Sequence, residues 1–496
     1  MSKNTAIPEP MVPVSNEVSR RTMMLSLAAA GLCLGGGGAA AWSQAGADSF
    51  ADGRPKIADR KFRSAAVEEF LARTRRRIGD PMLASLFMNC FPNTLDTTVE
   101  PGSFEGKPDT VVITGDIAAM WLRDSSAQVW PYLPLAAKDA ALLRLIEGVI
   151  RRQTRCLLID PYANAFMADL SAPPLSWSVH DKTDMKQGVG ERKYELDSLC
   201  YPIRLAYGYW KQTGGTEPFD AGWREAMKLV VQTMRVQQRK HGEGPYHFQR
   251  SSDVSMETLP NAGYGNPVKP VGLIASGFRP SDDACVYPFL VPSNLFAVTS
   301  LRQLAEMAQR ICGDAALAQD AHTLAAEVEA ALRRYAVVTV ENGTRPETIW
   351  AYEVDGFGSQ LLMDDANVPS LLGLPYLQSS LDEALYARTR AFVWSMRNPW
   401  FFRGSAGEGI GGPHEGQDMI WPMSQMVYAL TSKDDGEIVR ALAMLKVSSA
   451  GTGFMHESYF KNDAARFTRS WFAWANTLFG ELIAKLAATR PELLRR

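Results

Sequence analysis

The chain has little cysteine or histidine, and neither residue type gathers into a cluster. Its 496 residues include 6 cysteines and 6 histidines, which are scattered apart from the near neighbours His241 and His247. This scattering does not match the spacing of a zinc motif, nor the cysteine framework of a small disulfide-rich domain. We therefore expect no metal ion and no other cofactor.

Charge of one sign is not in excess either. Lys and Arg number 52 against 54 Asp and Glu, a net charge of −2, and 46% of the residues are hydrophobic. Nucleic-acid binding usually needs a basic surplus, and disorder needs low hydrophobicity with high net charge. The sequence also has no glycine-rich phosphate loop, low-complexity linker or common solenoid repeat. These absences favour one large globular domain without a nucleic-acid partner.

The first 47 residues are typical of an export signal rather than of a folded domain. Arg20 and Arg21 precede a weakly apolar stretch, and small residues suitable for cleavage follow at residues 45–47, with residues 39–41 as the competing site. The arginine pair indicates twin-arginine export, a route for folded proteins. We expect the mature protein to be periplasmic or secreted, with residues 48–496 as its single folded domain.

An uncleaved membrane anchor is the alternative interpretation of the same stretch. Four glycines at residues 35–38 make it short and only weakly apolar, whereas a membrane span needs about 20 predominantly apolar residues. The sequence therefore favours a cleaved signal and no stable membrane insertion after its removal.

The mature chain is predicted to be mainly α. In residues 294–312, for example, Leu295, Val298, Leu301 and Leu304 recur at the spacing of one helix face. Strand patterns are few and short, such as residues 110–113 and 337–340. Helical periodicity covers residues 67–78, 136–158, 222–238, 294–312, 315–336, 380–395, 436–445 and 470–487.

Long polar and aromatic loops separate these helices, and candidate acids and bases gather in the loops. Asp282 and Asp283 follow Arg279, and Glu457 follows His456 in a glycine-rich segment. Two separated carboxyl groups are what glycoside hydrolysis requires, one as an acid and the other as a base or nucleophile. A Ser-Asp-Asp sequence is, however, also an ordinary helix N-terminus, so this pattern alone indicates no more than a carbohydrate-active enzyme.

Taken together, the loops resemble glycoside hydrolase family 125, the exo-acting α-1,6-mannosidases, from about Phe87 to about Leu482. Several ordered blocks carry the resemblance, and the one clear departure is Ser470, where the family often has proline. The blocks are Asn-Cys-Phe-Pro-Asn-Thr-Leu-Asp-Thr-Thr at 89–98, Thr-Gly-Asp-Ile-Ala-Ala-Met-Trp-Leu-Arg-Asp-Ser at 114–125, Lys-Tyr-Glu-Leu-Asp-Ser-Leu at 193–199, Gly-Phe-Arg-Pro-Ser-Asp-Asp-Ala at 277–284, Gly-Ile-Gly-Gly-Pro-His at 409–414, His-Glu-Ser at 456–458 and Thr-Arg-Ser-Trp-Phe-Ala-Trp-Ala-Asn at 468–476.

The resemblance implies a single-domain (α/α)6 toroid and an inverting, metal-independent mechanism. It implies that Asp282 or Asp283 is the general acid, and that Glu457 is the general base. Adjacent residues point in different directions, so only one aspartate can face the glycosidic oxygen, and Asp283 is slightly preferred. Arg279 lies near both, and its charge would lower a carboxyl pKa although an acid catalyst needs a raised one.

The remaining residues of the expected site would contact the terminal mannose. The guanidinium of Arg123 can donate hydrogen bonds to neighbouring sugar hydroxyl groups, and the carboxylate of Asp124 can accept hydrogen bonds from them. The full set of expected sugar-binding residues is Arg123, Asp124, Trp121, Arg279, His414 and His456. Trp471 and Trp474 are further stacking candidates, although their helical spacing favours the core.

We conclude from the sequence that the chain is an exported, metal-independent α-mannosidase acting on mannose-containing oligosaccharides or glycans with α-1,6 linkages. Another helical-toroid exo-glycosidase, such as a glucosidase or a trehalase-like enzyme, would share the carboxyl chemistry and differ in its sugar contacts. A non-catalytic glycan-binding protein is the alternative from another class, and the presence of both proposed carboxyl positions argues against it.

Overall fold

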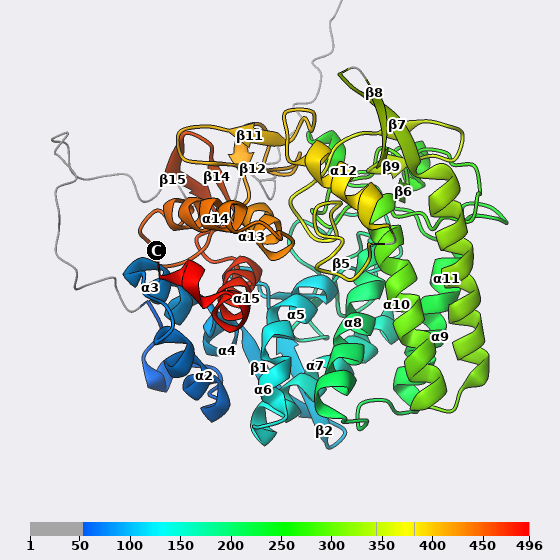
Figure 1. Ribbon diagram of the computed structural model, residues 1–496. Helices are drawn as coiled ribbons and strands as arrows, with labels where there is room; N and C mark the ends of the chain where they lie inside the picture. The colour runs from blue at the N-terminus through cyan, green and yellow to red at the C-terminus, as the bar shows by residue number, and fades with distance from the viewer. Residues whose placement is uncertain (1–52, 344, 381, 496) are drawn as a thin grey trace, which may run out of the picture. The chain divides into compact units, whose positions relative to one another are not determined.

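Aspartate caps mark the start of many helices in the computed structural model, which describes residues 53–343, 345–380 and 382–495 (Figure 1). In each case the carboxylate accepts a hydrogen bond from a backbone N–H of the first turn, which satisfies a donor that the helix leaves unpaired. The capping residues are Asp80, Asp139, Asp220, Asp314, Asp382 and Asp434.

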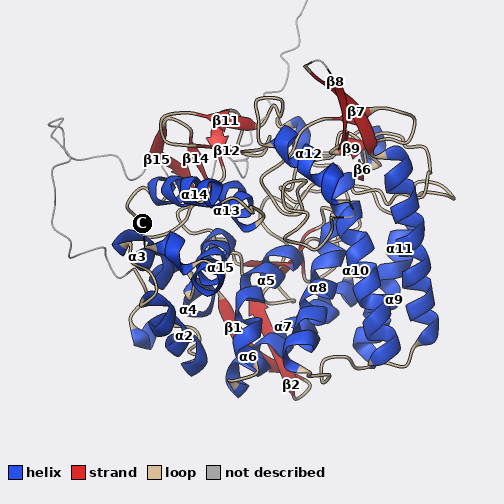
Figure 2. Cartoon of the chain, viewed as in Figure 1, coloured by secondary structure: helices blue, strands red, loops and turns tan. Residues whose placement is uncertain are grey.

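Helices dominate the described residues (Figure 2). Each helix that periodicity predicts is present, with ends shifted by a few residues. Helices α3, α4, α5, α8 and α13 lie outside the predicted ranges, and α6 shares only Ala136 with them. The helices are α2 (Ala65–Arg75), α3 (Pro81–Cys90), α4 (Asn93–Thr97), α5 (Leu122–Val129), α6 (Leu133–Ala136), α7 (Ala140–Ile159), α8 (Leu196–Thr213), α9 (Ala221–Val236), α10 (Val291–Arg310), α11 (Ala315–Tyr335), α12 (Glu383–Val393), α13 (Pro422–Leu430), α14 (Asp435–Ser448) and α15 (Ala473–Thr489).

The helices fall into two layers according to how much of their surface is buried. All residues of α5 and α13 are buried, as are most residues of α8, α10 and α15. Helices α2, α9, α11, α12 and α14 each bury one face and expose another, which is the pattern of an outer layer. The inner helices pack in the order α13–α15–α5–α8–α10, and outer helices α14 and α11 pack on α13 and α10.

Strands occur as small antiparallel sheets at the ends of helices. The β1–β2 hairpin packs on α7, where Gly148 is required because a Cβ would lie 2.2 Å from the Thr110 hydroxyl. The sheets pair β1 (Val99–Phe104) with β2 (Lys107–Val112), β7 (Val337–Asn342) with β8 (Arg345–Trp350), and β11 (Phe401–Arg403) with β12 (Glu408–Ile410). Three-stranded sheets are β3 (Ala119–Trp121), β4 (Ala165–Met167) and β5 (Val189–Glu191); β6 (Phe289–Leu290), β9 (Glu353–Val354) and β10 (Gln360–Leu361); and β13 (Met419–Ile420), β14 (Ser458–Phe460) and β15 (Asp463–Thr468).

Arg54 is one of the residues that fix the segment before α2 to the body of the protein. Arg54 donates hydrogen bonds to Asp96 over 2.8 Å and to Glu68 over 2.7 Å, and its side chain is only 6% exposed. Asp96 is itself buried, so Arg54 supplies a cation to a buried carboxyl group.

All described residues belong to one compact unit. Among them, no helix is both long enough and apolar enough to cross a bilayer. The expected export signal and its boundary at residue 47 lie outside the described residues and stay predictions.

Candidate active site

Buried acids gather where two inner helices begin. Arg123 and Asp124 lie in the first turn of α5, and Glu195 and Asp197 stand at the start of α8. The positive end of a helix dipole favours carboxylates at such positions. Arg123 donates to Glu195 over 2.6 Å and to Asp197 over 3.2 Å, and Asp124 accepts from Thr114.

Burial and mutual repulsion change the acidity of this group. Burial raises the pKa of Glu195 well above its usual value; Arg123 opposes the shift, whereas Asp282 and Asp197 add to it. The pKa of Asp197 is raised to about 6 by burial, again against Arg123. Neighbouring carboxyl groups away from water cannot all be ionised, so this cluster retains a proton near neutral pH.

The side chain of Asn164 connects the cluster to the Ser-Asp-Asp segment. Its amide nitrogen lies 3.1 Å from Glu191, 3.4 Å from Glu195 and 3.2 Å from Asp282 Oδ1. Arg123 also reaches Asp282, at 3.8 Å. Asp282 therefore belongs to the same charged network as Glu195.

The segment that carries Asp282 and Asp283 is a turn and not a helix cap. The next helix, α10, begins at Val291, so the helix-cap interpretation does not hold. Asp282 has a φ of 66°, a left-handed conformation that residues with a side chain rarely adopt outside functional sites. Arg279 braces the turn, since its guanidinium pairs with buried Glu353 at 2.6 Å and its backbone N–H donates to the Asp283 carbonyl.

Asp283 faces away from that network, towards His414. Its Oδ1 lies 3.3 Å from His414 Nδ1, and Oδ2 is buried without a hydrogen-bond partner. Burial lowers the pKa of His414, but the hydrogen bond and charge of Asp283, helped by Glu415 and Glu457, raise it to about 9. The imidazole is therefore charged at neutral pH.

Glu457 is held by Thr468, the last residue of β15, and by Arg469, which comes directly after that strand. Its carboxylate pairs with Arg469 at 3.2 Å and accepts from the Thr468 hydroxyl over 3.3 Å. Arg469 also pairs with Asp116, and its φ of 38° is left-handed. A buried guanidinium and a hydroxyl group thus fix the position of the Glu457 carboxylate.

The contacts run from one candidate carboxyl group to the other along two routes. Arg123 lies 3.6 Å from Asp124, and Asp124 is close enough to Arg469 for their charges to interact. On the other side, His414 bonds Asp283 and lies near Glu457. The structure thus brings Arg123, Asp124, Asp282, Asp283, His414 and Glu457 into one polar site built from distant parts of the chain.

His414, Glu415 and Glu457 form the one group of potential metal ligands within the described residues, with ligand atoms within 4.8 Å of one another. Coordination would need a neutral imidazole. Because the pKa of His414 is raised to about 9, a proton competes with any metal ion near neutral pH.

Other expected sugar-binding residues make mostly protein contacts. His456 is fully buried; its ring stacks on Phe467 with 3.6 Å between centroids, and burial lowers its pKa to about 4. Trp121 is 2% exposed in β3, just before Arg123, and Trp474 packs in the core on Tyr201. Arg279 is likewise held by Glu353. The contacts of these residues are thus with other parts of the protein that surround the site.

Several residues of the network carry no assigned role from sequence reasoning. Glu195, Asp197 and Arg469 stand inside the blocks that carry the family resemblance, and this was the signal that could have identified them. Asp116 also stands inside such a block, at 114–125, whereas Asn164 is an isolated polar residue without this signal. Trp421 is also brought to the site, with its ring 6.2 Å from that of His414.

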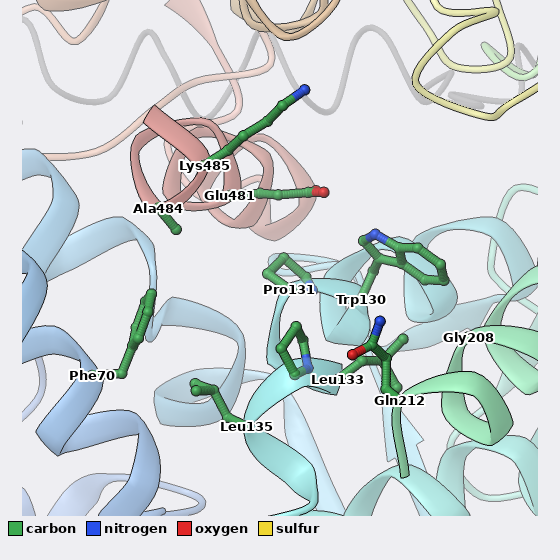
Figure 3. Close-up of a pocket in the computed structure, with 11 residues that line it drawn as sticks. Phe70, Trp130, Pro131, Leu133, Leu135, Gly208, Gln212, Glu481, Ala484 and Lys485 are labelled. Atoms are coloured by element: carbon green, nitrogen blue, oxygen red, sulfur yellow. The ribbon is translucent and has the colours of Figure 1, made fainter. Parts of the chain in front are cut away.

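A separate cavity of about 300 Å³ lies away from this site (Figure 3). Phe70 of α2, Leu135 of α6, Gly208 of α8 and Ala484 of α15 line it, so it sits among helices rather than among the catalytic loops. Glu481 reaches its wall and accepts a hydrogen bond from Tyr376. None of the candidate catalytic residues lines this cavity.

Comparison with protein families matches residues 80–484 to the family described as metal-independent alpha-mannosidase (GH125). A curated relative, the meiotically up-regulated gene 157 protein of Schizosaccharomyces pombe, is 42% identical over 465 residues, which cover 89% of this chain and 90% of the relative.

Solved structures agree with the family match. A metal-independent alpha mannosidase from Streptococcus pneumoniae, in a non-productive complex with alpha-1,6-mannobiose, is 40% identical with a TM-score of 0.82, covering 87% of this chain and 100% of that one. A variant of another glycosidase shares the fold alone, at 13% identity and a TM-score of 0.50, over 85% of this chain and 98% of that one. The expected fold class, mainly α of the (α/α)6 type, is confirmed.

Proposed function

The chain belongs to the GH125 family of metal-independent α-mannosidases, and from this premise we propose that it removes terminal mannose from α-1,6-linked mannosides with inversion. It is a glycoside hydrolase. One observation carries the proposal: two chains of contacts connect the Asp282–Asp283 turn with Glu457. One chain runs through His414, and the other runs through Arg123, Asp124 and Arg469. Two carboxyl groups on a shared polar site, one beside a buried acid cluster and one paired with Arg469, are the parts of a single-displacement reaction.

Asp282 is the better candidate for the general acid, in place of the slight sequence preference for Asp283. A general acid must hold a proton at the working pH. Asp282 hydrogen-bonds Glu195, a buried acid whose raised pKa lets it retain a proton that the two can share, whereas Asp283 faces the charged His414. Asp283 then positions His414.

Glu457 is the proposed general base. Its carboxylate pairs with Arg469, and water activated by this carboxylate would attack the anomeric carbon on the face opposite the leaving oxygen. Proton transfer from Asp282 to the glycosidic oxygen frees the leaving sugar as a hydroxyl compound. The new C–O bond forms as the old one breaks, so an α-mannoside yields β-mannose.

Arg123, Asp124 and His414 are the groups proposed to bind the terminal mannose. Each has a charged or hydrogen-bonding end in the network around the two carboxyl groups. A site built to bond particular hydroxyls rejects a sugar with those hydroxyls inverted, because its buried polar atoms are then left unpaired. The solved relative that holds alpha-1,6-mannobiose supports mannose as the sugar.

Proton NMR of the purified mature chain acting on α-1,6-mannobiose tests sugar, linkage and stereochemistry together. We expect β-mannose as the first product. Initial release of α-mannose would overturn the inverting mechanism, and activity on glucosides but not on mannosides would overturn the sugar assignment.

Leaving-group dependence separates the two aspartates. The Asp282→Asn variant should lose about 10²–10⁴-fold in kcat on mannobiose, but far less on 2,4-dinitrophenyl α-mannoside, which needs no protonation. Asp283→Asn should lose activity similarly on both substrates. The reverse pattern would make Asp283 the acid.

We also propose that the mature protein is exported, on the evidence of the paired arginines before the weakly apolar stretch. Changing Arg20→Lys together with Arg21→Lys should retain the protein in the cytoplasm, as measured by fractionation. Normal export of this double variant would refute the twin-arginine assignment.

A further inference from the structure

We propose that Asn164 is a positioning residue for the general acid: its side-chain amide fixes the carboxyl group of Asp282 for proton donation. The inference rests on the proposed function, because it takes Asp282 as the acid. Asn164 lies just before β4, fully buried, and is not adjacent in sequence to any of the acids it contacts.

The orientation of the amide is set by the backbone. The N–H of Lys193 donates to Asn164 Oδ1 over 3.1 Å. This contact requires an oxygen at that position, so the NH2 group must face the carboxyl groups. The main chain of Asn164 is fixed as well, because its carbonyl accepts from Leu122 N, at the start of the helix that carries Arg123.

Three acids meet at that NH2 group. Glu191, Glu195 and Asp282 all lie within 3.1–3.4 Å of Nδ2, although an amide has two hydrogens to give. Cations also lie close to these acids: Arg250 lies 3.0 Å from Glu191, and Arg123 lies 2.6 Å from Glu195 and 3.8 Å from Asp282. Asn164 is the group common to all three acids, so its removal would disturb their relative placement.

The amide faces one defined oxygen of Asp282. Asn164 Nδ2 and the guanidinium of Arg123 both face Oδ1. Glu195 also hydrogen-bonds Asp282, so the two donors hold the Asp282 carboxyl group beside a buried acid that can share a proton with it. Once Asp282 has given a proton to the glycosidic oxygen, both donors stabilise the carboxylate that remains.

The backbone of the turn is fixed from the same side. Lys193 Nζ donates to the Asp282 carbonyl over 2.8 Å, and the residue holds the left-handed φ described above. Lys193 thus binds the main chain of Asp282 with its side chain and orients Asn164 with its backbone N–H.

Two variants test the proposal. Asn164→Asp keeps the shape and the acceptor for Lys193 N–H but removes the donor, and Asn164→Ala removes the whole group. We expect kcat on α-1,6-mannobiose to fall about 10–10²-fold, less than loss of the acid itself, while kcat on 2,4-dinitrophenyl α-mannoside falls less than about 3-fold because that substrate needs no acid. KM should change little.

The pH profile gives a second readout. A donor to a carboxylate lowers its pKa, so in Asn164→Ala the basic limb of kcat/KM on mannobiose should move to higher pH. Equal losses on both substrates, or an unmoved basic limb, would reduce Asn164 to a structural role and overturn the proposal.

Asn294→Ala is the matched control. Asn294 is also fully buried, and its amide bonds only the backbone of Ile274 and Leu290. Its loss should lower thermal stability without changing the ratio of the two activities. If wild type does not hydrolyse mannobiose, or if Asp282→Asn lacks the leaving-group pattern, the proposed function fails. If those results hold and Asn164 variants behave like the control, only this inference fails.

Discussion

Arg469 holds Glu457 from a left-handed backbone conformation. Such a conformation costs about 1–3 kcal/mol, and here it lets one guanidinium reach both Glu457 and Asp116, which lie far apart in the chain. The strained residue, Arg469, is therefore the one that holds the proposed base, Glu457, in place.

Replacing that base gives the most direct test at the residue scale. In Glu457→Gln the side chain keeps its size but cannot accept a proton from water, so kcat should fall by about 10²–10⁴-fold. The exposed Glu69→Gln variant on α2 is the control and should match wild type. Turnover of Glu457→Gln within tenfold of wild type would remove Glu457 as the base.

His414 makes stability depend on pH in a definite direction. Its folded pKa, about 9, lies above the value of about 6.5 for an unfolded histidine. The His414–Asp283 pair therefore stabilises the fold fully below about pH 6.5, and this stabilisation is lost as the pH rises through about 9.

Urea unfolding of wild type and His414→Gln at pH 6 and pH 10 measures this effect. The difference in the free energy of unfolding between the two proteins should be larger at pH 6, because only there is the imidazole charged in both the folded and the unfolded states. A difference that is the same at both pH values would contradict the raised pKa.

At the scale of the elements, helices that are buried on one face were predictable, and helices buried all round were less so. Helices α9 and α11 show apolar residues at regular spacing after an aspartate cap, and both signals can be read locally. Helix α13 is buried throughout and has no side-chain cap, so neither signal is available. Helix α8 carries Pro202 in its interior, which argues against a helix on sequence grounds.

The candidate site was predictable only where family blocks marked it. Asp116 and Arg469 form an ion pair although 353 positions separate them in the sequence. Asn164 hydrogen-bonds three acids that lie on other segments of the chain. Neither relation leaves a periodic or local pattern. The chemistry of the carboxyl groups could be anticipated, whereas their partners depend on how the loops meet in space.

Close packing of α15 on the segment after α3 requires a glycine. A Cβ on Gly480 would lie 2.6 Å from the Cα of Phe91, and backbone cannot move aside easily. Gly480→Ala should therefore lower the free energy of unfolding by about 1–3 kcal/mol, the usual cost of overpacking.

Gly222→Ala in the first turn of α9 is the matched substitution, since its nearest neighbour would be an Asp220 oxygen at 3.4 Å. This change should leave the thermal midpoint unchanged or slightly raised, because alanine favours a helix. Equal midpoints for Gly480→Ala and wild type would refute the close contact.

For the molecule as a whole, stability should not depend on oxidation. The cysteines of the described residues, Cys90, Cys156, Cys200, Cys285 and Cys312, are all free thiols. Burial raises the pKa of these thiols, which suppresses the reactive thiolate.

Adding dithiothreitol should therefore leave the thermal midpoint of the protein unchanged. Alkylation with iodoacetamide should label the buried thiols only after unfolding. A midpoint that falls in reductant would show a stabilising disulfide and contradict the free thiols.

The contact of Arg54 with Asp96 has a practical meaning for maturation and for trimming the chain. A protease that cuts near residue 47 leaves Arg54 in place, a few residues from the new amino terminus. A chain shortened to begin at α2 would instead lose both Arg54 and Arg60 and leave the buried carboxyl group of Asp96 without either cation. An uncompensated buried charge is strongly destabilising, so this short segment sets the latest position at which the chain can be cut without harming the enzyme.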